Sequence, residues 1–196
     1  MGKLVKRVML GIVVLLLGAG VAMSVASGNP ERNRQWLVAQ VTDLGALLAS
    51  PDVRAEGVSD WSVYEQVEHL LLANQSICAL IEADTPPDPV VPKTFVGKMV
   101  LTSGYIPRGQ GQAPTGTVPE ARSRDQLLEL HGQVEAAVAA LDPGAISASD
   151  HVVGNHPVFG GFTAEDWLRL MVVHDVHHLK IVKDIQLAAG PGPGAP

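Results

Sequence analysis

Residues 167–182 read WLRLMVVHDVHHLKIV, an apolar run that carries two histidines one helical turn apart. Its apolar residues recur every three or four positions, which is the pattern of a helix with one buried face. His174 and His178 fall on that face, between Met171 and Ile181. Two imidazoles stacked on one face of a helix lie close enough to bind a single metal ion. The stretch therefore predicts a core helix and part of a metal site.

Capping signals mark where two of the expected helices begin. Thr163 is followed by Asp166 with the spacing of a capping box. The second helix starts at Ser59-Asp60 or at Ser62, and Ser62 with Glu65 has the same capping-box spacing.

The helical periodicity predicts four long helices, over residues 31–49, from the second-helix start to about 83, over 122–141 and over 164–187. Residues 84–120 contain repeated prolines and no sustained helical period, although residues 93–101 favour one short helix. The glycines and aromatic residues of 145–162 indicate a tight, anchored turn. We therefore expect an all-α fold, a four-helix bundle with a long crossover loop between helices 2 and 3.

A third histidine lies near the middle of the second helix. Beside the apolar stripe of that helix runs a small, mildly polar stripe with His69 at its centre, formed by Ser62, Gln66, His69, Ala73 and Ser76. Such a stripe lines a cavity or faces solvent. If the second and fourth helices are neighbours, His69, His174 and His178 converge on one point. Three neutral histidines suit Zn(II), Ni(II), Fe(II) or Mn(II), with further positions open to water or substrate.

Four other polar residues are secondary to these three. His177 points away from His174 on the helical wheel, and His156 enters the fourth helix from a turn that could reach the mouth of the site. Glu65 lies one turn before the second-helix histidine and either orients it or serves only the helix cap. His131 is offset from the apolar face of its helix, so we expect it on the surface. No residue stands out as a general base.

The first 26 residues form a separate segment. Lys3, Lys6 and Arg7 precede an uncharged stretch over 8–26, which is typical of an export signal or a membrane anchor. Both readings place the bundle, residues 27–190, outside the cytoplasm, and an uncleaved segment makes the membrane a partner. Residues 191–196 contain only Gly, Pro and Ala and predict a disordered tail.

Composition excludes some classes of function. The net charge is −6 and no basic patch is present, which argues against nucleic-acid binding. Cys78 is the only cysteine, so the fold contains no internal disulfide, and its apolar surroundings indicate a buried hydrophobe rather than a nucleophile.

Three motifs together resemble one family. They are the Trp61-Ser62 opening of the second helix with His69-Leu70 after it, the sequence His156-Pro157-Val158-Phe159-Gly160, and Trp167 followed by His174 and His178. In this order they resemble the DinB/YfiT-like metal-binding four-helix-bundle superfamily, in a branch usually filed as a domain of unknown function, over about residues 34–187. The resemblance implies a divalent metal ion bound by His69, His174 and His178.

The resemblance leaves several functions open. The family includes transferases and isomerases that use low-molecular-weight thiols, and many members have no assigned reaction. The N-terminal apolar segment is unlike most relatives and argues against thiol chemistry, because the thiol is scarce outside the cytoplasm. We expect a metal-dependent enzyme, a hydrolase acting on a small-molecule substrate. The alternatives are a non-catalytic metal-binding or stress-related envelope protein and a structural bundle with incidental histidines. Bundles of this type often pair, so a homodimer is an expectation.

Overall fold

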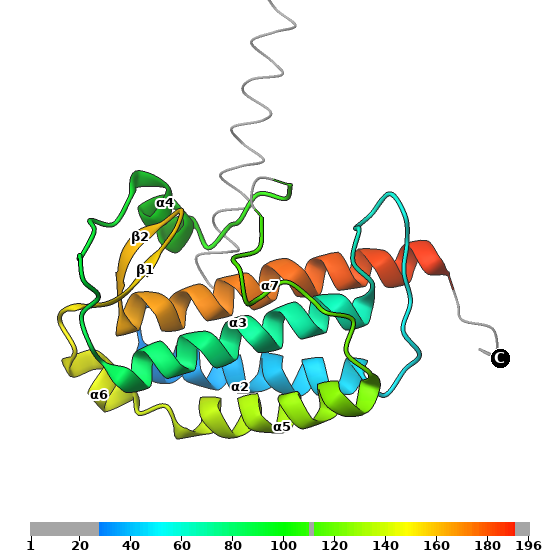
Figure 1. Cartoon of the computed structure of the whole chain (residues 1–196), viewed down its shortest axis with the longest axis horizontal. Coiled ribbons are helices and arrows are strands. Elements are labelled where there is room, and N and C mark those ends of the chain that lie inside the picture. Colours follow the sequence, from blue (N-terminus) through cyan, green and yellow to red (C-terminus); the bar gives the residue numbers. More distant parts are fainter. Residues whose placement is uncertain (1–27, 110–111, 191–196) are drawn as a thin grey trace, which may run out of the picture.

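The computed structural model describes residues 28–109 and 112–190. Four long helices form a bundle: α2 (Pro30–Leu47), α3 (Val63–Ala83), α5 (Arg124–Ala140) and α7 (Ala164–Ala189). Both α2 and α3 pack against α5 and against α7, so α5 and α7 lie diagonally across the bundle (Figure 1). The predicted four-helix bundle is confirmed within these residues.

The core lies between the four helices and consists almost entirely of aliphatic side chains. Leu37, Val41 and Leu44 come from α2, and Val67, Leu70 and Leu71 come from α3. α5 adds Leu127, Val134 and Val138, and α7 adds Leu168, Met171 and Val172. Each set recurs at helical spacing, so one stripe of every long helix faces the shared centre.

Most helix starts follow from capping residues. Ser62 with Glu65 and Thr163 with Asp166 form complete capping boxes at the starts of α3 and α7, as the sequence predicts. The third long helix begins at Arg124 rather than at residue 122, because Ser123 caps it.

The crossover between α3 and α5 contains one short helix, α4 (Phe95–Ser103), close to the predicted 93–101. A second short helix, α6 (Pro143–Ala148), follows α5 directly and was not predicted. Asp142 caps this helix, because its side chain accepts from the backbone N–H of Gly144.

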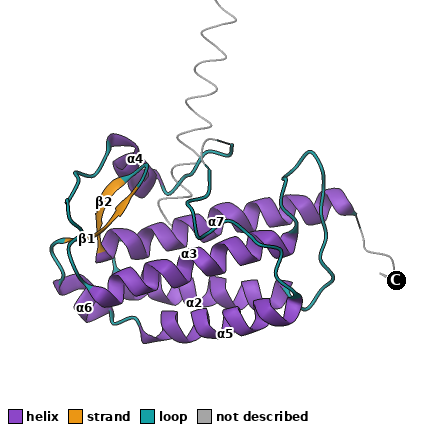
Figure 2. Cartoon of the chain, viewed as in Figure 1, coloured by secondary structure: helices purple, strands orange, loops and turns teal. Residues whose placement is uncertain are grey.

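The expectation of an all-α fold was wrong in one segment, since β1 (Val152–His156) and β2 (Gly160–Thr163) form an antiparallel hairpin. The hairpin lies with α4 at the end of the bundle where α7 begins (Figure 2). Gly161 donates a backbone hydrogen bond to Val91 (N···O 3.2 Å) and Thr94 donates one to Phe159 (2.9 Å). The crossover thus runs beside β2, and its backbone supports a strand that local sequence signals do not reveal.

His131 is not the surface residue that the sequence suggested. It is half-buried, and its Nε2 lies 2.8 Å from the backbone oxygen of Val41 on α2, to which it donates. Gly45 makes room for it, because a Cβ there would come within 2.6 Å of the same nitrogen. The imidazole therefore links α5 to α2.

None of the helices in the described residues is both long enough and apolar enough to cross a membrane. The predicted signal or anchor at 1–26 and the predicted tail at 191–196 lie outside the described residues.

Candidate metal centre

Three histidines from two helices meet near the middle of the bundle. His69 projects from α3, and His174 and His178 project from the neighbouring α7. One ring nitrogen from each lies within 4.8 Å of those of the other two, and the Nε2 atoms of His69 and His174 are 3.2 Å apart. The structure therefore brings together the three residues that the sequence singled out.

Two of the rings are fixed by hydrogen bonds at their other nitrogen. Nδ1 of His69 donates to the backbone oxygen of Thr117 (2.7 Å), and Nδ1 of His178 donates to Oε1 of Gln66 (2.6 Å). The Gln66 amide is itself oriented, because its nitrogen donates to the hydroxyl of Ser59 (2.9 Å). In the neutral imidazoles these bonds leave Nε2 with a lone pair, which is the arrangement found in histidine metal ligands.

The environment keeps the three rings uncharged. Burial lowers the pKa of His69, while the hydrogen bond to Thr117 opposes part of that shift. Burial and the neighbouring imidazoles hold the pKa of His174 and of His178 well below the usual value of 6.5. Neutral imidazole is the form that coordinates metal, so the site is ready to bind a cation at neutral pH.

The donor set fits a divalent transition metal. Metal–nitrogen bonds of about 2.1 Å in tetrahedral geometry place neighbouring nitrogens about 3.4 Å apart. The observed 3.2 Å between the His69 and His174 Nε2 atoms is close to that separation. Two facing imidazole lone pairs repel each other, and a shared cation removes that repulsion. The arrangement is therefore compatible with a divalent ion of undetermined identity.

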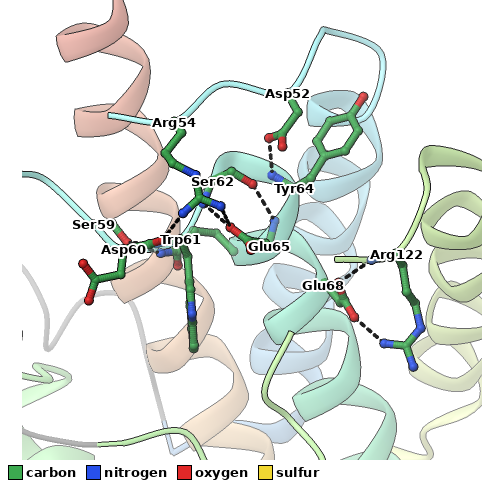
Figure 3. Close-up of polar contacts among 11 residues, drawn as sticks. Asp52, Arg54, Ser59, Asp60, Trp61, Ser62, Tyr64, Glu65, Glu68 and Arg122 are labelled. Carbon is green, nitrogen blue, oxygen red and sulfur yellow. Dashed lines mark hydrogen bonds and ion pairs between the residues drawn. The ribbon is translucent and has the colours of Figure 1, made fainter. Parts of the chain in front are cut away.

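Glu65 is engaged with Ser62 and Arg54, as Figure 3 shows. Its carboxylate accepts from the backbone N–H of Ser62 (2.7 Å) and pairs with Arg54 (2.5 Å), whose side chain also donates to the backbone oxygen of Asp60. Of the two roles considered for Glu65, these contacts support the helix cap. Thr117 and Gln66 orient the histidines instead.

A buried carboxylate next to His69 attaches the crossover to α3. Glu68 is 1% exposed and accepts from the backbone N–H groups of Glu120 (2.8 Å) and Arg122 (3.1 Å) and from the Arg122 guanidinium (Figure 3). These bonds hold the end of the crossover against α3 at Glu68, the neighbour of His69 in the sequence. They lie a few residues after Thr117, which accepts from His69.

Sequence reasoning missed both Glu68 and Thr117. Glu68 could have been noticed because it is a charged residue between Val67 and His69 on a helix that is otherwise largely apolar. Thr117 accepts from His69 through its backbone carbonyl. Every residue carries this group, so no residue type marks the position in the sequence.

The two secondary histidines lie outside the group of three. His156 Nδ1 accepts from the backbone N–H groups of Val158 (3.1 Å) and Phe159 (3.2 Å), and its ring stacks on Phe159 with centroids 4.1 Å apart. It thus organises the hairpin turn, and burial lowers its pKa to about 4. His177 meets His178 edge-on at 5.0 Å and is hydrogen-bonded to the backbone of Ile106.

Trp61 packs beside the histidines at the start of α3. Its ring centroid lies 5.0 Å from that of His69 and 6.5 Å from that of His178, nearly parallel to the latter with 20° between the planes. An indole in this position shields the rings from water, and it belongs to the same motif as His69.

The family comparison covers most of the chain. The model of the DinB superfamily matches residues 31–182, a range that contains the three histidines and the hairpin. No curated protein and no solved structure was found to match. The match agrees with the resemblance seen in the three sequence motifs, and the chain belongs to the DinB superfamily.

Proposed function

We propose that this protein binds one divalent metal ion through the Nε2 atoms of His69, His174 and His178. The observation that carries the proposal is the convergence of three neutral imidazoles, two of which, His69 and His178, are already hydrogen-bonded at the outer nitrogen. Such outer partners fix the tautomer and the direction of a ligand before the ion arrives.

We further propose that the site is catalytic and hydrolytic, acting on a small molecule. Three protein ligands are typical of catalytic rather than structural zinc sites. A bound divalent ion supplies Lewis acidity and lowers the pKa of water toward neutrality. The chain's own part is to hold the ligands, through Gln66 and Thr117, and to limit water around them, through Trp61. Glu65 and Glu68 are both engaged in ion pairs, so neither is proposed as the general base. The alternative is a non-catalytic metal-binding protein that uses the same ligands.

Metal analysis of the purified full-length chain tests the binding proposal. We expect about one equivalent of bound divalent metal, lost in His174→Ala and retained in His151→Ala. His151 is a matched control because it lies beside Asp84, at the far end of α3 from His69. Bound metal below about a tenth of an equivalent, or content unchanged by His174→Ala, contradicts the proposal.

A panel of small ester, amide and phosphoester substrates then tests the catalytic part. We expect hydrolysis that a chelator abolishes, that added metal restores and that His174→Ala lacks. A metal-loaded protein that turns over none of these substrates supports the non-catalytic alternative.

A further inference from the structure

Exposed apolar side chains are concentrated in α4, in the residues beside it and in the hairpin turn. Most of the large apolar residues that are exposed in the described part of the chain belong to α4, its flanks or the hairpin turn, namely Val90, Phe95, Val96, Met99, Tyr105 and Val158. Phe95 is 76% exposed. We call Phe95, Val96, Met99 and Val158 the α4 patch.

These residues belong to one surface because the hairpin turn is bonded to the start of α4. The hydroxyl of Thr94, which caps α4, donates to the backbone oxygen of Val158 (3.1 Å). The buried side of the helix, which includes Val100 and Leu101, faces the protein. An apolar face that is turned outward in this way commonly marks an interaction site.

The segment that carries most of the α4 patch is basic, although the whole protein is acidic. Residues 90–109 contain Lys93, Lys98 and Arg108 and no acidic residue, although the chain has a net charge of −6. Lys93 pairs with Asp166 and Arg108 with Asp184. Lys98 lies within α4, is exposed and forms no ion pair among the described residues. A helix that exposes apolar residues and lysine together is typical of an anionic membrane surface.

The first described residue of the chain also lies at this end of the bundle. Gly28 lies beside Glu165 in the first turn of α7, since a Cβ on this glycine would be 3.7 Å from the Glu165 carboxylate. Lys93, just before α4, pairs with the adjacent Asp166 at 2.5 Å. Gly28, the first described residue, therefore lies at the end of the bundle that carries α4, and the uncharged residues 8–26 precede it in the sequence.

We propose that the α4 patch rests on a lipid bilayer that carries anionic headgroups. Phe95, Val96 and Met99 enter the boundary between headgroups and acyl chains, and Lys98 pairs with lipid phosphate. α4 packs on α7, and α5 lies diagonally across the bundle from α7, so α5 then faces water. The proposal does not depend on metal binding, because no ligand of the metal centre belongs to this face.

Site-specific fluorescence on the full-length chain tests this orientation. An environment-sensitive probe is attached at Met99→Cys, or at Glu135→Cys on α5 as the matched control, in a Cys78→Ala background. The chain is reconstituted in phosphatidylcholine vesicles with or without phosphatidylglycerol, and nitroxide-labelled lipids serve as quenchers. We expect a blue shift and strong quenching at position 99 and neither at position 135. Phe95→Ser lowers the quenching-competent fraction about tenfold, and Lys98→Glu lowers it only in the anionic vesicles.

Two results overturn the proposal. One is equal quenching at positions 99 and 135, which means that the patch does not face lipid. The other is a probe at position 99 that is already shielded without vesicles. Shielding that depends on protein concentration indicates a second copy, and shielding that does not indicates coverage by residues 8–26 of the same chain.

Discussion

At the scale of single residues, the metal centre depends on side chains that would not touch the ion. The Gln66 amide accepts from His178 and donates to Ser59, so both of its ends are committed and its orientation is fixed. Its removal leaves the Nδ1–H of a buried imidazole without an acceptor, and the ring loses both its tautomer and its direction.

Gln66→Leu should therefore weaken metal affinity about 10- to 100-fold. Titration calorimetry with Zn²⁺ on the chelator-stripped chain measures the change. Gln75→Leu is the matched control, since Gln75 lies on the same helix and its side chain donates to the exposed Gln133. Equal affinities in the two variants would show that the amide does not position the ligand.

His156 predicts how stability depends on pH. Burial lowers its pKa in the folded chain to about 4, below the usual 6.5, so the unfolded chain binds the proton more readily. The contribution of the neutral imidazole is complete above pH 6.5 and is lost as the pH falls toward 4.

Between pH 7.5 and 5.5, wild type should lose about 1 kcal/mol more unfolding free energy than His156→Gln, a value reduced to allow for the partial exposure of the ring. Urea unfolding with a chelator present measures this difference. The comparison with His156→Gln removes the contribution of the other histidines, and parallel pH profiles would contradict the prediction.

At the scale of elements, the helices could be predicted from the sequence but the hairpin could not. Helical stripes such as Leu37, Val41 and Leu44 repeat locally, and capping pairs such as Thr163 and Asp166 mark boundaries. The hairpin depends instead on backbone that is distant in the sequence, because Gly161 donates a hydrogen bond to Val91 in the crossover. The only sequence signal of this contact is a glycine, and a glycine is equally typical of a turn.

Gly161→Ala should cost about 1–3 kcal/mol of unfolding free energy, because its Cβ would come within 2.3 Å of the backbone oxygen of Val91. Gly132→Ala on α5 is the matched control, since a Cβ there meets nothing within 4 Å. The control should stabilise the helix by about 0.5–1 kcal/mol. Chemical unfolding of both variants measures the pair, and a neutral Gly161→Ala would show that the crossover can move away from β2.

At the scale of the whole molecule, the three histidines connect parts of the chain that are far apart in sequence. The grouping was predictable because the sequence places histidines on the inward sides of two expected helices, and metal sites in bundles form between facing helices. Their hydrogen-bond partners on the crossover were not, because no periodic pattern places residue 117 over α3. A bound ion would join α3 to α7, and α3 is already clamped to the crossover by Glu68.

Metal should therefore stabilise the whole fold and not only the site. Free Zn²⁺ at 100 times its dissociation constant should raise the unfolding free energy by about 2.7 kcal/mol. Thermal unfolding with and without metal measures the gain, which His174→Ala should abolish and His151→Ala should keep. A metal-bound protein with an unchanged unfolding midpoint would mean that the ion also binds the unfolded chain.

The hydrogen bond from His69 to the backbone oxygen of Thr117 also affects how the crossover can vary in evolution. A main-chain acceptor survives replacement of its side chain, provided that the path of the backbone is kept. The crossover can therefore drift in sequence while it still orients a metal ligand. Alanine scanning of this segment would therefore not reveal the role of Thr117. Insertions or deletions between α4 and Glu120, whose backbone N–H is held by Glu68, would be the changes that disturb the site.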